Sequence, residues 1–256
     1  MRGRITLNIE EKVLNNGKSI LTSYLLNNSP EFKNITTRPA VLIFPGGGYH
    51  FVSDREAEPV AMSFLAEGYN AFVLRYSVGE GEEFSSAFRE AEEAIALIYQ
   101  NANEWNVDKD KIAVIGFSAG GHLAASLATM GKIRPDALIL GYPCILSSIE
   151  EVLAFPIPSV EAEVDASTPQ TFLFSTFEDE LVPVEHTLQF MQALNDYQIP
   201  FESHIFQHGK HGLSLAKSHL SAGIEENVNE DVAKWFDLSV NWLKKVLGDF
   251  DMNEEV

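Results

Sequence analysis

The chain has 256 residues, of which 45% are hydrophobic and 21% charged, so it is long enough to bury a sizeable core. Its 18 basic and 37 acidic residues give a net charge of −19, which argues against nucleic acid, anionic membranes and polyanionic substrates as partners. Met1 to Asn8 lacks the apolar core of a signal peptide, and no apolar run reaches the ~18 residues of a membrane span. Cys144 is the only cysteine, so no intrachain disulfide can form. We therefore expect a soluble, cytoplasmic protein.

Short apolar runs alternate with stretches of helical periodicity along the chain. Residues 18–26 alternate loosely and predict an edge strand or one arm of a hairpin, followed by a polar loop up to Pro39. The later strands are expected at 40–44, 70–76, 112–115, 137–140, 170–176 and 201–206. Helices are expected from near Pro59 to Gly68, over 84–101, from the residues before Leu123 to Gly131, and over 186–197 and 230–247.

This alternation predicts an α/β fold with a mainly parallel sheet and helices on both of its faces. One domain over residues 1–256 suffices. Ser53 and Glu56 have the Ser-x-x-Glu spacing of a capping box, which predicts a short capped turn before Pro59. Residues 141–168 lack steady periodicity and are the one stretch with room for a small lid segment over an active site.

A G-x-S-x-G pentapeptide, Gly116 to Gly120, follows the expected strand at 112–115 directly and leads into a helix-forming run. A strand, a sharp turn and a helix in this order are the context of a nucleophile elbow, with Ser118 at its apex. The turn would hold Ser118 in a strained conformation, and side chains at the two outer glycines would crowd the neighbouring strand and helix. Ser118 is therefore the candidate nucleophile.

Three further stretches are Phe44–Tyr49 with its triple glycine, Asp179–Pro183, and Phe206–Gly212. Together with the pentapeptide they resemble the α/β-hydrolase superfamily, in particular bacterial acetylesterase and carboxylesterase-type proteins related to the hormone-sensitive-lipase group and acetyl xylan esterase-like proteins. The resemblance implies the α/β-hydrolase fold with a minimal lid insertion. It also implies a serine esterase that hydrolyses small acyl (acetyl-type) esters through an acyl-enzyme, with acetylated sugars as candidate substrates.

A serine hydroxyl needs a base within hydrogen-bond reach and a carboxylate that orients this base. In the family the partners follow in the order Ser, Asp or Glu, His, and the resemblance assigns them to Asp179 and His211. His208 is the rival base, although we expect it to pack or to bind backbone in the same loop. The resemblance gives His122 a structural role.

The acidic neighbours of Asp179, Glu178 and Glu180, are interpreted as part of a solvated loop. His204, His208 and His211 could in principle ligate a metal, but no H-E-x-x-H pattern or carboxylate–cysteine cluster accompanies them. No metal and no cofactor are therefore expected, and the expected partner is a small-molecule ester.

By position, the resemblance makes the backbone amides of Gly47, Gly48 and Ala119 donors to the developing oxyanion. Pro45 stands where many relatives have His, which leaves open how this loop is anchored. Tyr49, Phe51 and Phe117 are candidates for an acyl pocket or for the core. Two alternative functions remain at this point: a prolyl-oligopeptidase-like serine peptidase, and a non-catalytic binding module on the same fold.

Overall fold

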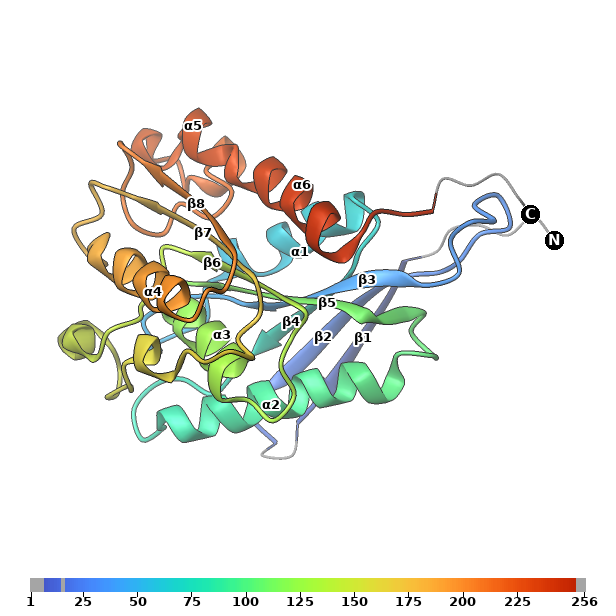
Figure 1. Ribbon diagram of the computed structural model, residues 1–256, viewed down its shortest axis with the longest axis horizontal. Coiled ribbons are helices and arrows are strands. Elements are labelled where there is room, and N and C mark those ends of the chain that lie inside the picture. Colours follow the sequence, from blue (N-terminus) through green and yellow to red (C-terminus); the bar gives the residue numbers. More distant parts are fainter. Residues whose placement is uncertain (1–6, 15–16, 252–256) are drawn as a thin grey trace.

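Eight strands form one sheet in the order β1-β2-β4-β3-β5-β6-β7-β8, in a computed structural model that describes residues 7–14 and 17–251 (Figure 1). The prediction made on Met1 to Asn8 lies outside the described residues, except for the last two. The strands are β1 (Leu7–Val13), β2 (Ile20–Leu26), β3 (Arg38–Phe44), β4 (Asn70–Arg75), β5 (Val107–Phe117), β6 (Ala137–Gly141), β7 (Thr171–Thr176) and β8 (Phe201–Phe206).

The sheet is mainly parallel, because β3 to β8 all run in one direction and only the β1–β2 and β2–β4 pairs are antiparallel. β2 is thus the inner arm of a hairpin, while the strand at this edge of the sheet is β1, which the sequence analysis did not predict. All seven residues of β1 are exposed, and their sequence LNIEEKV carries three charges. Charged side chains protect an exposed sheet edge, but they also remove the apolar pattern by which a strand is predicted.

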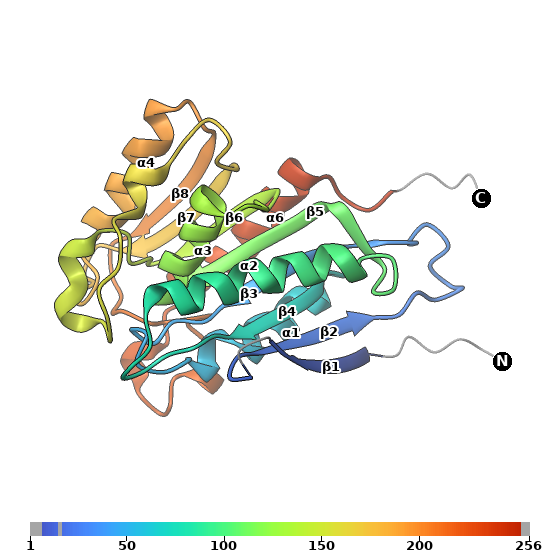
Figure 2. The ribbon, with the colours of Figure 1, turned by 90° about the horizontal axis from the view of Figure 1, so that it is seen from below.

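Helices cover both faces of the sheet (Figures 1 and 2). α2 (Phe84–Asn101), α3 (Ala119–Met130) and α4 (Glu185–Asp196) pack on one face, and α1 (Glu58–Ala66), α5 (Glu230–Ala233) and α6 (Trp235–Leu247) pack on the other. Successive residues of β5 point to opposite faces, so Ile112 and Val114 enter one core and Ala113 and Ile115 the other. The predicted α/β-hydrolase architecture is therefore confirmed.

The expected capping box is wrong. The Ser53 side chain makes no capping bond to the 3₁₀ turn Asp54–Glu56 that follows it. The Glu56 carboxylate is buried and accepts a hydrogen bond from the Gly46 amide instead (Oε2–N 2.8 Å). The spacing was correct for a cap, but a contact with a distant loop takes the carboxylate that the cap would need.

Residues 141–168 contain two 3₁₀ turns, Ser147–Val152 and Val160–Glu163. After Gly141, this segment has no α-helix and no β-strand. The Ala154 amide donates to the Gly48 carbonyl oxygen (2.9 Å), so the segment is tied to the glycine-rich loop after β3. The other 3₁₀ turns are Ser218–Leu220 and Glu225–Asn227. In the described part of the chain, no helix is both long and apolar enough to span a membrane.

Candidate active site

Ser118 lies in the turn between β5 and α3, with φ 54° and ψ −120°. Glycine is required on both sides of it, because a Cβ on Gly116 would lie 2.1 Å from the Gly120 carbonyl oxygen. A Cβ on Gly120 would in turn lie 2.1 Å from the carbonyl oxygen of Phe44 in β3. The nucleophile elbow predicted from the pentapeptide is thus present as a strained turn packed tightly between strand and helix.

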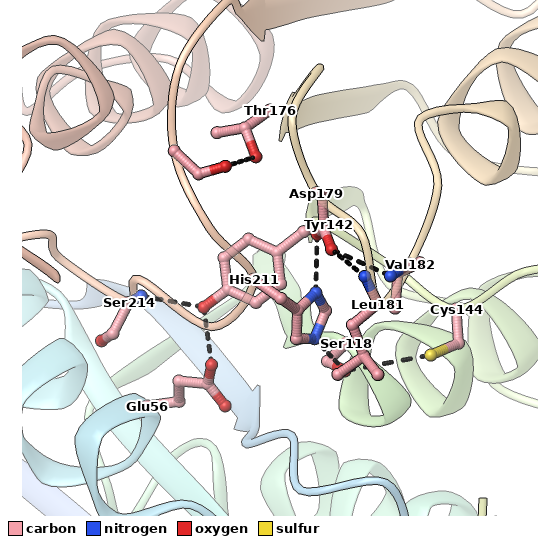
Figure 3. Close-up of polar contacts among 11 residues, drawn as sticks. Glu56, Ser118, Tyr142, Cys144, Thr176, Asp179, Leu181, Val182, His211 and Ser214 are labelled. Atoms are coloured by element: carbon pink, nitrogen blue, oxygen red, sulfur yellow. Dashed lines mark hydrogen bonds and ion pairs between the residues drawn. The ribbon is translucent and has the colours of Figure 1, made fainter. Parts of the chain in front are cut away.

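The structure brings Asp179, His211 and Ser118 into one hydrogen-bonded line (Figure 3). His211 Nε2 lies 2.8 Å from Ser118 Oγ, and His211 Nδ1 lies 2.6 Å from Asp179 Oδ2. With Nδ1–H donating to the carboxylate, Nε2 is left with a lone pair that accepts the serine hydroxyl. This is the geometry that a serine nucleophile and its base require, although the catalytic roles themselves stay predictions.

The Asp179 carboxylate is held from its other side by backbone amides. Its side chain is 1% exposed, and Oδ1 accepts hydrogen bonds from the amides of Leu181 (3.0 Å) and Val182 (2.9 Å). The residues that follow Asp179, up to Pro183, therefore fold back onto its carboxylate. Two amides and the imidazole fix the orientation of both carboxylate oxygens.

The rival groups lie at the surface. Glu178 Oε1 pairs with His208 Nδ1 at 2.8 Å, and the His208 side chain is 67% exposed. The expectation that the His208 side chain packs or binds backbone within its own loop is wrong, because the surface carboxylate of Glu178 provides its partner. His204 pairs with Glu202, and among the described residues no three His, Cys, Asp or Glu side chains gather as metal ligands would.

The glycine-rich loop is anchored without the histidine that many relatives have in place of Pro45. The Pro45 carbonyl oxygen accepts a hydrogen bond from the buried Tyr76 hydroxyl (2.5 Å), and Gly46 donates to Glu56 as described above. Gly47 and Gly48 have φ values of +127° and +64°, which favour glycine. Within the described residues their amides donate to no protein acceptor, and neither does the amide of Ala119, the first residue of α3. These three amides are thus available as oxyanion donors, as the resemblance implies.

A buried network that the sequence analysis missed connects this loop to the loop that carries His211. The Tyr142 hydroxyl donates to Glu56 Oε1 (2.6 Å) and accepts from the Ser214 amide (2.9 Å) (Figure 3). Burial raises the pKa of Tyr142 well above its usual range, so the hydroxyl keeps its proton for Glu56. The Tyr142 ring also packs edge-on against the His211 ring, with centroids 5.0 Å apart.

A pocket of about 350 Å³ opens beside Ser118. Its apolar wall combines the glycine-rich loop, the 141–168 segment and the loop after β7, through Phe51, Val152, Leu153, Leu181 and Val182. The prediction of Tyr49 and Phe117 as substrate-binding residues is not supported, because both rings are completely buried in the two cores and line no part of this pocket. Of the three aromatic candidates, Phe51 is the one that lines it.

Two buried histidines hold the elements around the site. His122 Nδ1 lies 2.9 Å from the Tyr49 hydroxyl and Nε2 lies 2.9 Å from the Pro158 carbonyl oxygen, which agrees with the structural role expected for this residue. His186 Nδ1 accepts from the amides of Ile145 and Leu146 (2.9 and 3.1 Å). Burial lowers the pKa of His122 and of His186 to about 4, so both are neutral near pH 7.

The buried Cys144 lies next to the nucleophile. Its Sγ is 3.9 Å from Ser118 Oγ, and its side chain forms part of the pocket wall. Burial raises the pKa of the thiol to about 12. The sulfur is therefore an uncharged contact for Ser118 rather than a competing nucleophile.

Comparisons with known proteins agree with this geometry. A family model described as BD-FAE matches residues 29–136, and the model of the prolyl oligopeptidase family matches residues 154–249. An α/β-hydrolase enzyme from a Medee basin deep-sea metagenome library is 50% identical, with a TM-score of 0.89 over 94% of this chain and 98% of that chain.

Two further solved structures are similar over nearly their whole length. A carboxylesterase from Lactobacillus plantarum WCFS1 is 27% identical, with a TM-score of 0.84 over 93% of this chain and 97% of that chain. An acetyl ester-xyloside bifunctional hydrolase from Caldicellulosiruptor lactoaceticus is 34% identical, with a TM-score of 0.76 over 90% and 89%.

The chain spans only part of the curated relatives that it matches. It covers 34% of endo-1,4-beta-xylanase B from Butyrivibrio fibrisolvens, with 33% identity over 73% of this chain. The deep-sea metagenome enzyme, by contrast, is matched over 98% of its own length at 50% identity. The chain belongs to the α/β-hydrolase family.

Proposed function

We propose that this protein is a serine esterase that hydrolyses small acyl esters, acetyl esters above all, through an acyl-enzyme intermediate. The observation that carries the proposal is the continuous line from Asp179 through His211 to Ser118, with distances of 2.6 and 2.8 Å. Beside it lie amides that donate to no acceptor in the described part of the chain. Similarity to a carboxylesterase and to an acetyl ester-xyloside hydrolase supports the same reaction class.

In the proposed reaction, Ser118 Oγ attacks the carbonyl carbon of the ester while His211 Nε2 takes its proton. The negative charge that develops on the carbonyl oxygen is stabilised by the amides of Gly47, Gly48 and Ala119. His211 then donates the proton to the leaving alkoxide, which departs as the alcohol. Water, deprotonated by the same nitrogen, cleaves the acyl-enzyme and releases the carboxylic acid.

The pocket supports a short acyl group and an acetylated sugar as the substrate class. Its volume of about 350 Å³ lies at the small end of the range for ligand sites, roughly 300–1,000 Å³. The Gly48–Ala154 hydrogen bond holds residues 141–168 against the glycine-rich loop, which limits the space beside Ser118. One solved relative acts, by its name, on acetyl esters and xylosides, which makes acetylated xylo-oligosaccharides the first natural substrates to test.

The test measures hydrolysis of p-nitrophenyl esters from acetate to octanoate by the wild-type protein and by Ser118→Ala. We expect the rate to be highest for the shortest esters and to fall to background in the variant. Release of acetate from acetylated xylo-oligosaccharides tests the sugar substrate separately. Equal rates for the two proteins would contradict the proposal, and a fluorophosphonate probe that leaves Ser118 unlabelled would favour a non-catalytic binding module.

A second candidate function, a serine peptidase, rests on the match of residues 154–249 to the prolyl oligopeptidase family. A chromogenic proline amide assayed beside p-nitrophenyl acetate separates the two. Cleavage of the amide without cleavage of the ester would reverse the order of the candidates. A cytoplasmic location stays a prediction from composition.

A further inference from the structure

Arg55 places a permanent positive charge in the wall of the pocket that contains Ser118. Its side chain is half-buried, in the 3₁₀ turn Asp54–Glu56. The other described residues that line this pocket are uncharged side chains, histidines and the buried Glu56. A guanidinium at this place is unexpected in a chain whose net charge is −19.

The carboxylates nearest to Arg55 in sequence are all bound elsewhere. Asp54 and Glu58 both pair with Arg75, at 3.0 and 2.8 Å, and Glu56 points into the buried network with Gly46 and Tyr142. No carboxylate of residues 7–14 or 17–251 forms an ion pair with Arg55. The run Asp-Arg-Glu-Ala-Glu thus leaves its arginine without a protein anion while satisfying its three acids.

The guanidinium is held on the side of the pocket where His211 lies. The Arg55 carbonyl oxygen accepts from Ser214 Oγ (2.5 Å), which fixes the backbone of the turn to the loop that carries the histidine. Nη2 lies 3.5 Å from the point that a Cβ on Gly212 would occupy, and Gly212 directly follows His211. A side chain at Gly212 would therefore stand against the guanidinium.

In the proposed esterase mechanism, His211 delivers its proton to the leaving oxygen, so the alcohol part of the ester must lie on this side of Ser118. We propose that Arg55 binds a carboxylate carried by that alcohol part, so that the enzyme favours acylated hydroxy acids, such as O-acetylated uronic acid units, over neutral esters. A guanidinium fork matches a carboxylate in a bidentate geometry, whereas a neutral hydroxyl needs no fixed charge to bind. This inference rests on the proposed esterase function.

The experiment compares two acetate esters that differ in one charge on the alcohol part, p-acetoxybenzoate and p-acetoxybenzamide. The measured quantity is the ratio of their kcat/KM values, the anionic ester over the neutral one. Arg55→Gln should lower this ratio roughly tenfold or more, because a charge-assisted bidentate contact is lost. Arg55→Lys should retain part of the preference.

The matched control is Lys109→Gln, which removes one positive charge from an exposed position of β5 outside the pocket. It changes the net charge by the same amount, so it reports any long-range effect of the acidic surface, and its ratio should equal that of the wild type. A third substrate, mono-p-nitrophenyl succinate, carries its carboxylate on the acyl part. Its kcat/KM should respond to Arg55→Gln no more than that of the neutral p-nitrophenyl acetate.

The outcomes separate the inference from the function beneath it. If wild-type protein hydrolyses neither acetoxy ester, both the esterase function and the role of Arg55 are overturned. If it hydrolyses both and Arg55→Gln leaves the ratio unchanged, only the role of Arg55 is overturned. The same conclusion follows if Arg55→Gln lowers kcat/KM for the succinate ester more than for p-nitrophenyl acetate. An inhibition measurement on wild-type protein needs no variant. The product p-hydroxybenzoate should inhibit at lower concentration than p-hydroxybenzamide, and equal inhibition would count against the inference.

Discussion

Replacing Tyr142 with Phe tests whether the buried network positions the active-site loops or only stabilises the fold. The substitution removes one hydroxyl and keeps the ring, so packing against His211 is retained. It deletes the 2.6 Å bond to Glu56 and the 2.9 Å bond from Ser214, and it leaves a buried carboxylate oxygen and a buried amide without this partner.

The size of the effect follows from those two bonds. A hydrogen bond to a carboxylate contributes about 1.5–3 kcal/mol and one between neutral groups about 0.5–1.5 kcal/mol. We therefore expect the free energy of unfolding to fall by about 2–4.5 kcal/mol. Glu56 also binds the Gly46 amide, so the loop before the oxyanion donors should shift, and a displacement of this kind lowers kcat roughly 10- to 100-fold. KM should change little, because the hydroxyl itself does not line the pocket.

Urea denaturation and steady-state hydrolysis of p-nitrophenyl acetate measure the two effects on the same samples. Tyr69→Phe is the control, since Tyr69 is also buried and its hydroxyl forms no hydrogen bond with any residue that the structure describes. An unfolding free energy within about 0.5 kcal/mol of wild type would refute the energetic argument. Lost stability with unchanged kcat would refute the positioning role and leave the network a purely structural one.

Three further predictions concern the triad, the buried histidines and the cysteine. Asp179→Asn should lower kcat on the order of 10⁴-fold in the p-nitrophenyl acetate assay, because an amide favours the wrong tautomer of His211; a loss below about tenfold would contradict the assignment. Burial lowers the folded-state pKa of His122 and His186 to about 4, below the 6.5 of an unperturbed histidine, so the unfolded chain binds more protons between these values. Their stabilising contribution should be complete above pH 6.5 and should be lost toward pH 4, by up to about 1.4 kcal/mol per pH unit for each residue; urea titrations at about pH 7.5, 6 and 5 that give equal stability would exclude this. Cys144 should resist iodoacetamide at about pH 8 in the folded protein and react in urea, since burial raises the pKa of its thiol to about 12; intact mass shows the adduct, and rapid labelling without urea would be the contrary result.

The amino-acid sequence by itself determined the α/β fold class with its alternating strands and helices, the elbow and the candidate triad. These features have local signatures: a buried strand is a short apolar run, and the turn at Ser118 needs glycine at 116 and 120 because a Cβ at either position would meet backbone at 2.1 Å. Asp179 and His211 could be proposed since each follows a recognisable strand within a stretch that resembles a known family. The N-terminal strand Leu7–Val13 escaped prediction because all its residues face solvent.

Only the tertiary structure decided which side chains surround the nucleophile. Glu56 has the sequence spacing of a helix cap, yet its carboxylate meets Tyr142, 86 residues away, and Tyr142 meets Ser214 after another 72. Tyr49 and Phe117 stand next to the catalytic motifs in sequence, but the turn after β3 directs the first ring, and β5 the second, into the cores. Local patterns report backbone conformation and burial, whereas the direction of a side chain toward a partner depends on how distant loops converge at the carboxyl ends of the parallel strands.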